Sequence, residues 1–279
     1  MTSDERGTLG ESDEPSERDA AGPISPGVGF AASTRGPRDA VVIVALLAAL
    51  LLLARAALGP LTDALVRRIP AGVDESVGSK LADFQRATSA PIDDLRTVHV
   101  RDLLNLVEPR VRRAVGNEVA VGSFRVTVLD SNEVNAFALP GGEVFVLRGL
   151  LEAKHVTDDV LVGILAHELA HAALRHGVRG IVRHNLVRTA AAVLFGGLDT
   201  GTVAIVGGGL TLGDLAYDRA MEDEADGLAA RVLLASGRPL EPLAVFLESL
   251  DAMGPTVALL ANHPAGADRA ARLRAHEGR

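Results

Sequence analysis

The sequence contains no cysteine, so disulfide bonds and thiolate metal ligands are excluded, and any bound metal must be held by His, Asp or Glu. Tryptophan is also absent and aromatic residues make up only 3%, so the interior has to be built from Ala, Leu and Val. The net charge of −8 argues against a nucleic-acid-binding protein. With 279 residues, 48% of them hydrophobic, the chain has room for one or two domains with a sizeable core.

Residues 1–39 are rich in Gly, Pro, Ser, Asp and Glu and show no periodic apolar spacing, so we interpret them as a disordered acidic tail. The uncharged apolar run that follows resumes after Arg55 and gives, over residues 40–58, nearly the ~20 residues that cross a bilayer. We favour a transmembrane anchor at 40–58. A cleaved signal sequence and a buried core helix stay open as alternatives.

The rest of the chain is interpreted as a linker at 59–75 and a folded domain at 76–279. Apolar spacing predicts helices at 80–88, 98–115, 219–235, 240–253 and 267–274, and strands at 124–129, 134–139 and 144–147. Pro140-Gly141-Gly142 indicates a turn between the last two strands. The small apolar stretch 184–216 fits either two buried helices or a membrane-embedded hairpin. We therefore expect a mostly helical α+β domain with a small sheet.

The segment His167-Glu168-Leu169-Ala170-His171 lies in a stretch with helical apolar spacing, for which Thr157 suits the start and Gly177 suits the exit. Residues four apart on a helix project from one face, so His167 and His171 can bind the same zinc ion. Glu168 stands beside them, where it can accept a proton from the water that the metal activates. The pattern predicts a hydrolytic zinc site.

Such a site needs a third protein ligand and one open position. A third His six residues after His171 is absent, because position 177 is Gly, so a Glu from a later helix is the alternative. Glu222 and Asp226 share a helix face, whereas Glu224 points roughly 200° away from Glu222. We expect Glu222 to bind zinc and Asp226 to accept a hydrogen bond from a ligand His. The competing interpretation is an acidic cluster that only complements a helix dipole.

Three motifs in this order, namely HELAH at 167–171, EDEAD at 222–226 and NAFALPGGEVFV at 135–146, resemble the HtpX and CAAX prenyl protease family of gluzincin zinc metallopeptidases. The resemblance covers about residues 93–275, includes Arg269 near the end, and is nearest the BepA-like branch, whose members carry one anchor or none. It implies one Zn²⁺ per chain, with Glu168 as the catalytic acid and base. The ligands it implies are His167, His171 and Glu222.

The resemblance also brings the segment Asn262-His263-Pro264 near the active site and so places His263 within reach of the metal. We expect His263 to act as a gate or as a transition-state residue, and a capping or packing role stays open as the alternative. The resemblance further implies that an extended substrate is added as a strand along Val144, Phe145 and Val146. We expect His176, one turn beyond His171, to be structural or solvent-facing rather than a ligand.

The leading hypothesis is a single-pass, membrane-anchored zinc endopeptidase that hydrolyses peptide bonds in misfolded or misassembled proteins. Its expected partners are protein or peptide substrates and, through residues 40–58, the membrane, with no nucleic acid. The catalytic domain is expected on the extracytoplasmic side. The alternative is a zinc-bearing chaperone or envelope assembly factor whose peptidase activity is latent.

Overall fold

A computed structural model of the chain describes residues 37–116, 119, 121–195, 217–253, 263 and 266–277. Outside these residues lie the expected disordered tail up to residue 36, the part of the small apolar stretch from 196 to 216, and both neighbours of His263. The chain divides into two compact units, residues 1–51 and 52–279.

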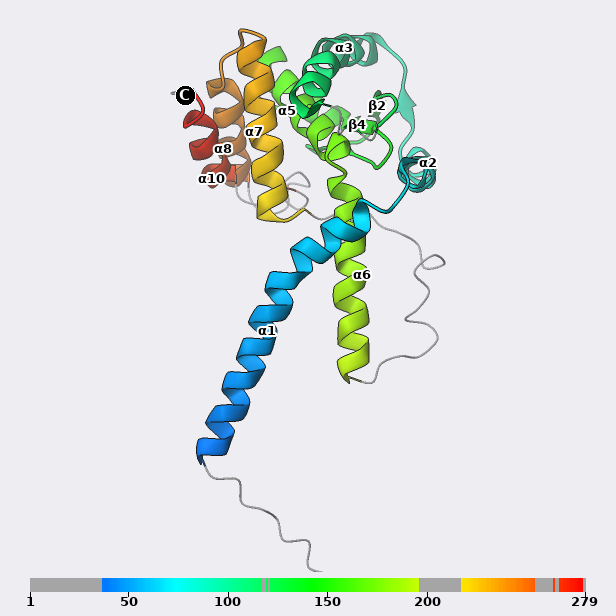
Figure 1. Cartoon of the computed structure of the whole chain (residues 1–279). Helices are drawn as coiled ribbons and strands as arrows, with labels where there is room; N and C mark the ends of the chain where they lie inside the picture. Colours follow the sequence, from blue (N-terminus) through cyan, green and yellow to red (C-terminus); the bar gives the residue numbers. More distant parts are fainter. Residues whose placement is uncertain are drawn as a thin grey trace, which may run out of the picture. The chain divides into compact units, whose positions relative to one another are not determined.

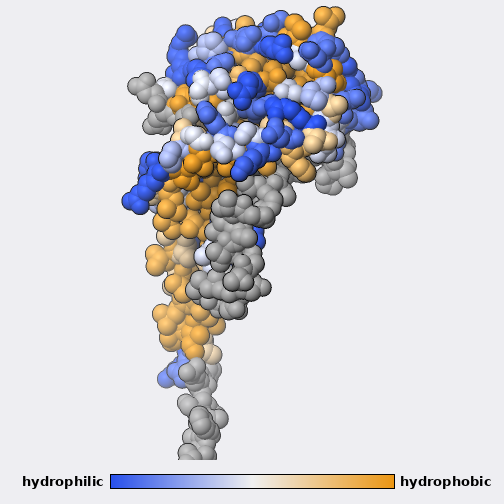
Figure 2. Space-filling view, turned by 90° about the vertical axis from the view of Figure 1, so that its right-hand side faces the viewer, coloured by the Kyte–Doolittle hydropathy of each residue, from blue (hydrophilic) through white to orange (hydrophobic). Residues whose placement is uncertain are grey.

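Helix α1 (Pro37–Val66) contains the apolar run that was predicted as an anchor. Within the described part of the chain it is the one helix long and apolar enough to cross a membrane, and the most apolar stretch of it is not buried. The apolar side chains of α1 form the orange stretch in the lower part of Figure 2. An uncovered apolar helix of this length has the composition of a membrane span.

The predicted linker at 59–75 is wrong, because α1 continues to Val66 and α2 (Ala71–Thr88) soon follows. Pro60 removes one helical hydrogen bond, but the Leu and Ala residues around it have high helix propensity. Tertiary contacts also hold this end of α1, since Val66 is buried and Arg175 donates to the carbonyls of Val66 and Ile69 at 3.0 Å. The end of α1 is therefore part of the folded domain.

The domain is mostly helical with one small sheet, which confirms the α+β class (Figure 1). Its remaining elements are β1 (Pro91–Ile92), α3 (Leu95–Val115), β2 (Arg125–Leu129), β3 (Ala136–Ala138), β4 (Glu143–Leu147), α4 (Arg148–Leu151), α5 (Asp158–Ala173), α6 (His176–Phe195), α7 (Arg219–Ala235), α8 (Glu241–Met253) and α10 (Gly266–Arg274). The small apolar stretch begins inside α6, which is a single helix as far as it is described.

The sheet has the strand order β1-β2-β4-β3, with β2 and β4 parallel and β3 antiparallel to β4. The expectation that Val144, Phe145 and Val146 form a substrate-binding edge is wrong, because β4 is paired on both sides and all of its residues are buried. A continuous apolar run is typical of such an inner strand. The outer strand beside β4 is β3.

Helix α5 lies at the centre of the domain, with α7, α8 and α10 on one side and the sheet on the other (Figure 1). All residues from Val160 to Ala173 are buried, and α5 packs against α3, α7, α8 and β3. Gly163 permits the close approach of α8, since an added Cβ would lie 2.7 Å from Leu243 Cδ2. The polar side chains of α5 are therefore enclosed in an apolar core and require buried partners.

Thr157 caps α5 as predicted, because its Oγ1 accepts a hydrogen bond from the Val160 N–H. The predicted exit at Gly177 is wrong: α5 ends at Ala173, and Arg175 takes the left-handed conformation, with φ of 58°. That conformation costs a residue with a Cβ roughly 1–2 kcal/mol. The Arg175 guanidinium offsets this strain with two hydrogen bonds to the buried carboxylate of Asp74, at 2.6 and 2.8 Å.

Candidate metal centre

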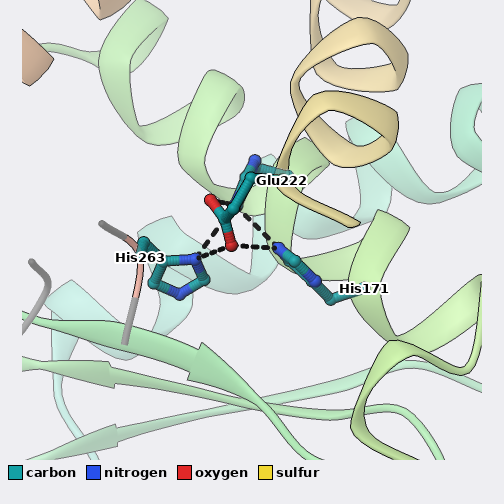
Figure 3. Close-up of side chains that lie close together, drawn as sticks. His171, Glu222 and His263 are labelled. Atoms are coloured by element: carbon teal, nitrogen blue, oxygen red, sulfur yellow. Dashed lines mark hydrogen bonds and ion pairs between the residues drawn. The ribbon is translucent and has the colours of Figure 1, made fainter. Parts of the chain in front are cut away.

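Four side chains bring metal-binding atoms to one point inside the domain, with those atoms all within 4.8 Å of one another. His167 and His171 come from α5, Glu222 from the first turn of α7, and His263 from the chain before α10. Each is 5% exposed or less. Figure 3 shows nitrogens of His171 and His263 facing the carboxylate of Glu222 from opposite sides. The structure thus brings together the three predicted ligands and the predicted gate residue.

The spacing of these atoms fits one zinc ion. The Nε2 atoms of His167 and His171 are 2.9 Å apart, and they lie 3.5 and 3.4 Å from the two oxygens of Glu222. Ligand atoms held tetrahedrally at about 2.0–2.1 Å from zinc are roughly 3.3 Å from each other. Burial and then the neighbouring His167 lower the pKa of His171 well below its usual value, so this ring is neutral, as a metal ligand must be.

His263 lies against the same group of donors. Its Nδ1 is 2.9 Å from Glu222 Oε1 and 3.3 Å from His167 Nε2. Its Nε2 is buried, has no hydrogen-bond partner among the residues that the structure describes, and lies 3.4 Å from Glu168 Oε1. Burial lowers the pKa of His263, but the carboxylates of Glu222 and Glu168 outweigh this effect and the pKa is raised. The ring is therefore within reach of both the group of donor atoms and the Glu168 carboxylate.

Glu168 is 1% exposed and is held by the outer strand of the sheet. Its Oε2 accepts a hydrogen bond of 2.8 Å from the main-chain N–H of Ala138 in β3. Burial raises the pKa of this carboxyl group, and the lowering effect of the nearby His263 and His167 does not cancel it. One oxygen is thus fixed, and the carboxylate is a stronger base than an exposed Glu.

Asp226 lies behind the ring of His167, with its Oδ1 3.0 Å from His167 Nδ1. Arg269 of α10 donates to both Asp226 oxygens at 2.8 and 2.7 Å, and its Nη1 is 3.1 Å from Glu222 Oε2. Burial raises the pKa of Asp226, but the hydrogen bonds from Arg269 and His167 outweigh it and the pKa is strongly lowered. Arg269 therefore neutralises two buried carboxylates of the site at once.

The role of Arg269 could not be worked out from the motifs. Arg269 is 43 residues beyond Asp226 in the sequence, so no helical spacing connects the two. The one signal is helical periodicity, because Arg269 precedes the buried Leu273 by one turn and so shares its inward face.

The other face of the site is lined by His176 and Tyr217. The solvent-facing interpretation of His176 is wrong, since its side chain is fully buried and its Nδ1 is 2.9 Å from His171 Nδ1. Glu224 points away from the metal ligands, with its Oε2 3.0 Å from His176 Nε2. The ring of Tyr217 stacks on His171 with 3.7 Å between centroids, and its hydroxyl donates to the Ala138 carbonyl at 3.5 Å.

Comparison with known proteins places these residues in a family context. Residues 105–277, more than half of the chain, match the profile of "Peptidase family M48". The chain is 29% identical to metalloprotease LoiP of Escherichia coli over 170 residues, which cover 59% of this chain and 67% of LoiP. It is 33% identical to mitochondrial metalloendopeptidase OMA1 of Schizosaccharomyces pombe over 148 residues, covering 50% of this chain and 42% of the relative.

A third relative is the beta-barrel assembly-enhancing protease of Yersinia pestis, 30% identical over 203 residues, which cover 64% of this chain and 39% of that protein. The chain thus spans about two thirds of LoiP and less than half of the other two. All three relatives are named as proteases, and the matched family residues include the whole metal centre.

Proposed function

We propose that this chain, which belongs to peptidase family M48 and is therefore a metallopeptidase, cleaves protein substrates with a zinc ion held by His167, His171 and Glu222. The observation that carries this proposal is the buried group of donor atoms with Glu168 beside it. A donor set of two imidazoles and one carboxylate, without thiolates, is typical of catalytic zinc.

A zinc ion bound there supplies a Lewis acid that polarises a carbonyl oxygen and lowers the pKa of water. Glu168 carries out the proton transfers: its carboxylate takes a proton from the attacking water and then gives that proton to the leaving amine. In the substrate-free structure Ala138 holds Oε2, so Oε1 is the carboxylate oxygen that is not bound by β3. The raised pKa of Glu168 favours both steps, since the group binds a proton more readily than an exposed Glu.

Asp226 and Arg269 set the orientation of the first ligand. A hydrogen bond from His167 Nδ1 to Asp226 Oδ1 keeps the proton on Nδ1 and leaves the lone pair of Nε2 for the metal. Arg269 in turn holds Asp226 with two hydrogen bonds, so the carboxylate cannot rotate away.

The outer edge of β3 is the place for an extended substrate. Main-chain bonds from Leu139 and to Asn135 connect β3 to β4, and in an antiparallel pair the alternate residues, Ala136 and Ala138, direct their groups the other way. Ala138 also contacts Glu168, so a strand added there would run beside the catalytic carboxylate. Pairing at Ala138 requires Glu168 and Tyr217 to release its N–H and carbonyl first.

The position of His263 favours a latent form of the enzyme as a second candidate. In this conformation His263 Nδ1 lies among the ligand atoms, where it would compete with water for the open position of the metal. We propose that outward movement of His263 accompanies activation. If that movement is rare, the protein would act as a zinc-bearing assembly factor with latent peptidase activity.

Helix α1 supports anchoring in a membrane as a single span, and we place the catalytic domain on the extracytoplasmic side. A relative is named for enhancing β-barrel assembly, which supports misfolded or misassembled envelope proteins as substrates. Recognition by strand addition suits such substrates, because it uses main-chain groups that every unfolded segment exposes.

The test is cleavage of a fluorescence-quenched casein by the full chain in detergent, with zinc content measured in parallel. We expect turnover that a chelator stops and added zinc restores, and none from Glu168→Gln, which should still hold zinc. Glu133→Gln, an exposed carboxylate on the same domain, is the matched control. If the wild type binds zinc without cleaving casein, and the His263→Ala variant does not cleave it either, the assembly-factor function is favoured.

A further inference from the structure

His176 is enclosed beside the metal centre but is not one of the four residues that contribute donor atoms to it. It is fully buried at the start of α6, and both of its ring nitrogens have partners. Nδ1 faces His171 Nδ1 at 2.9 Å, and Nε2 faces Glu224 Oε2 at 3.0 Å. The ring therefore bridges a proposed zinc ligand and a carboxylate at the domain surface.

Only one arrangement of protons satisfies all of these contacts when zinc is bound. Zinc needs the lone pair of His171 Nε2, so the proton of that neutral ring is on Nδ1. His171 Nδ1–H then donates to His176 Nδ1, which must be unprotonated. The proton of His176 is consequently on Nε2, from which it donates to the Glu224 carboxylate.

Helix geometry explains why a bridging histidine is present. On α7, Glu222 points to the metal and Asp226 reaches His167 directly. Glu224 leaves the helix on another side, roughly 200° from Glu222, so it cannot contact His171 itself. His176 spans that gap from α6. In the motif at 222–226, Glu222 thus faces the metal, Asp226 contacts the ring of His167, and Glu224 acts on the ring of His171 through His176.

We propose that His176 and Glu224 are positioning residues of the metal centre, which fix the proton and the orientation of His171 as Asp226 does for His167. This inference rests on the proposed function, since it assumes zinc at His167, His171 and Glu222. Tyr217, stacked on His171, restrains the plane of the ring but makes no contact that selects its protonated nitrogen. That selection belongs to His176.

Glu224 is itself held from the outside. Its carboxylate lies 3.3 Å from Arg179, and Arg179 is 3.1 Å from Asp63 at the end of α1. About half of the Glu224 side chain is exposed, so solvent weakens its effect on the metal relative to that of the buried Asp226. We therefore expect the loss of Glu224 to be milder than the loss of His176.

The experiment measures zinc affinity by competition with a chromogenic chelator, using the full chain in detergent and no substrate. His176→Leu should weaken zinc binding on the order of 10–100-fold, as the loss of a hydrogen bond to a ligand His does. His176→Gln should recover most of that loss, because the amide can accept from His171 and donate to Glu224. Glu224→Ala should fall between wild type and His176→Leu, and Asp223→Asn should match wild type.

Thermal unfolding of the zinc-free variants separates positioning from a purely structural role. If His176 is purely structural, its substitutions should lower the stability of the zinc-free protein, and His176→Gln should not restore zinc affinity. If His176 is a positioning residue, the variants should show the zinc affinities given above. Wild-type zinc affinity in His176→Leu would overturn the inference and leave the proposed function intact. If His176→Leu does not fold, equal affinities for Glu224→Ala and Asp223→Asn would overturn it. A wild type that binds no zinc would overturn both proposals.

Discussion

Asp226→Asn isolates one charge at the back of the metal centre. The carboxylate is 4% exposed and receives two hydrogen bonds from Arg269, at 2.8 and 2.7 Å. Asn keeps the size and one acceptor oxygen but loses the charge, so the buried guanidinium loses its main partner. His167 Nδ1, 3.0 Å from the same carboxylate, loses a charged acceptor as well.

Two effects follow, on stability and on metal affinity. Removing one partner of a buried ion pair costs about 3–5 kcal/mol. Arg269 retains Glu222 Oε2 at 3.1 Å, which favours the lower end, about 3 kcal/mol. For a domain of this size that corresponds to a melting temperature lower by roughly 6–12 °C. Zinc binding should weaken on the order of 10–100-fold in addition.

The assay is thermal unfolding of the zinc-free full chain in detergent, followed by circular dichroism, together with chelator competition for zinc. Asp223→Asn is the matched control, because it lies on the same helix in an exposed ion pair with Arg272 and should change stability by less than about 1 kcal/mol. If Asp226→Asn melted together with Asp223→Asn and bound zinc as wild type does, the assigned role of Asp226 would be refuted.

Four further outcomes are expected. Glu168→Gln should keep fold and zinc but lose casein cleavage, because an amide cannot accept the proton of water; retained turnover would remove it from the mechanism. Glu222→Ala should abolish zinc binding while Glu224→Ala only weakens it, and equal losses by metal analysis would contradict the ligand assignment. Removal of residues 1–58 should leave a soluble, folded domain, since the contacts of Arg175 with the end of α1 are kept; sedimentation of this truncation with membranes would show a second membrane contact. His263→Ala should raise basal cleavage if the ring is a gate and lower kcat if it stabilises the transition state, and an unchanged rate in the same assay would exclude both roles.

Local periodicity predicted several helices, but not the end of α1, the start of α2 or how the elements pair. Residues 219–235 are helical at the predicted bounds, and Thr157 caps α5, because both features depend on neighbours within one turn. The edge assigned to β4 was wrong because β4 pairs with β2 past the intervening β3, which local spacing does not reveal. The exit at Gly177 was wrong for a similar reason: Arg175 takes the left-handed position, stabilised by the distant Asp74.

The metal centre divides in the same way. Four-residue spacing is sufficient to place His167 with His171 and Glu222 with Asp226, and an apolar helix with polar residues in it implies that α5 and α7 meet at those residues. Orientation of the rings is decided by side chains that no spacing connects to the motif, Arg269 from α10 and His176 from α6. His176 was therefore expected to be structural or solvent-facing, although it follows His171 by only five residues. A buried imidazole next to a ligand must share its protons with that ligand, so the contact that sequence could not show also selects which nitrogen of His171 is available to the metal.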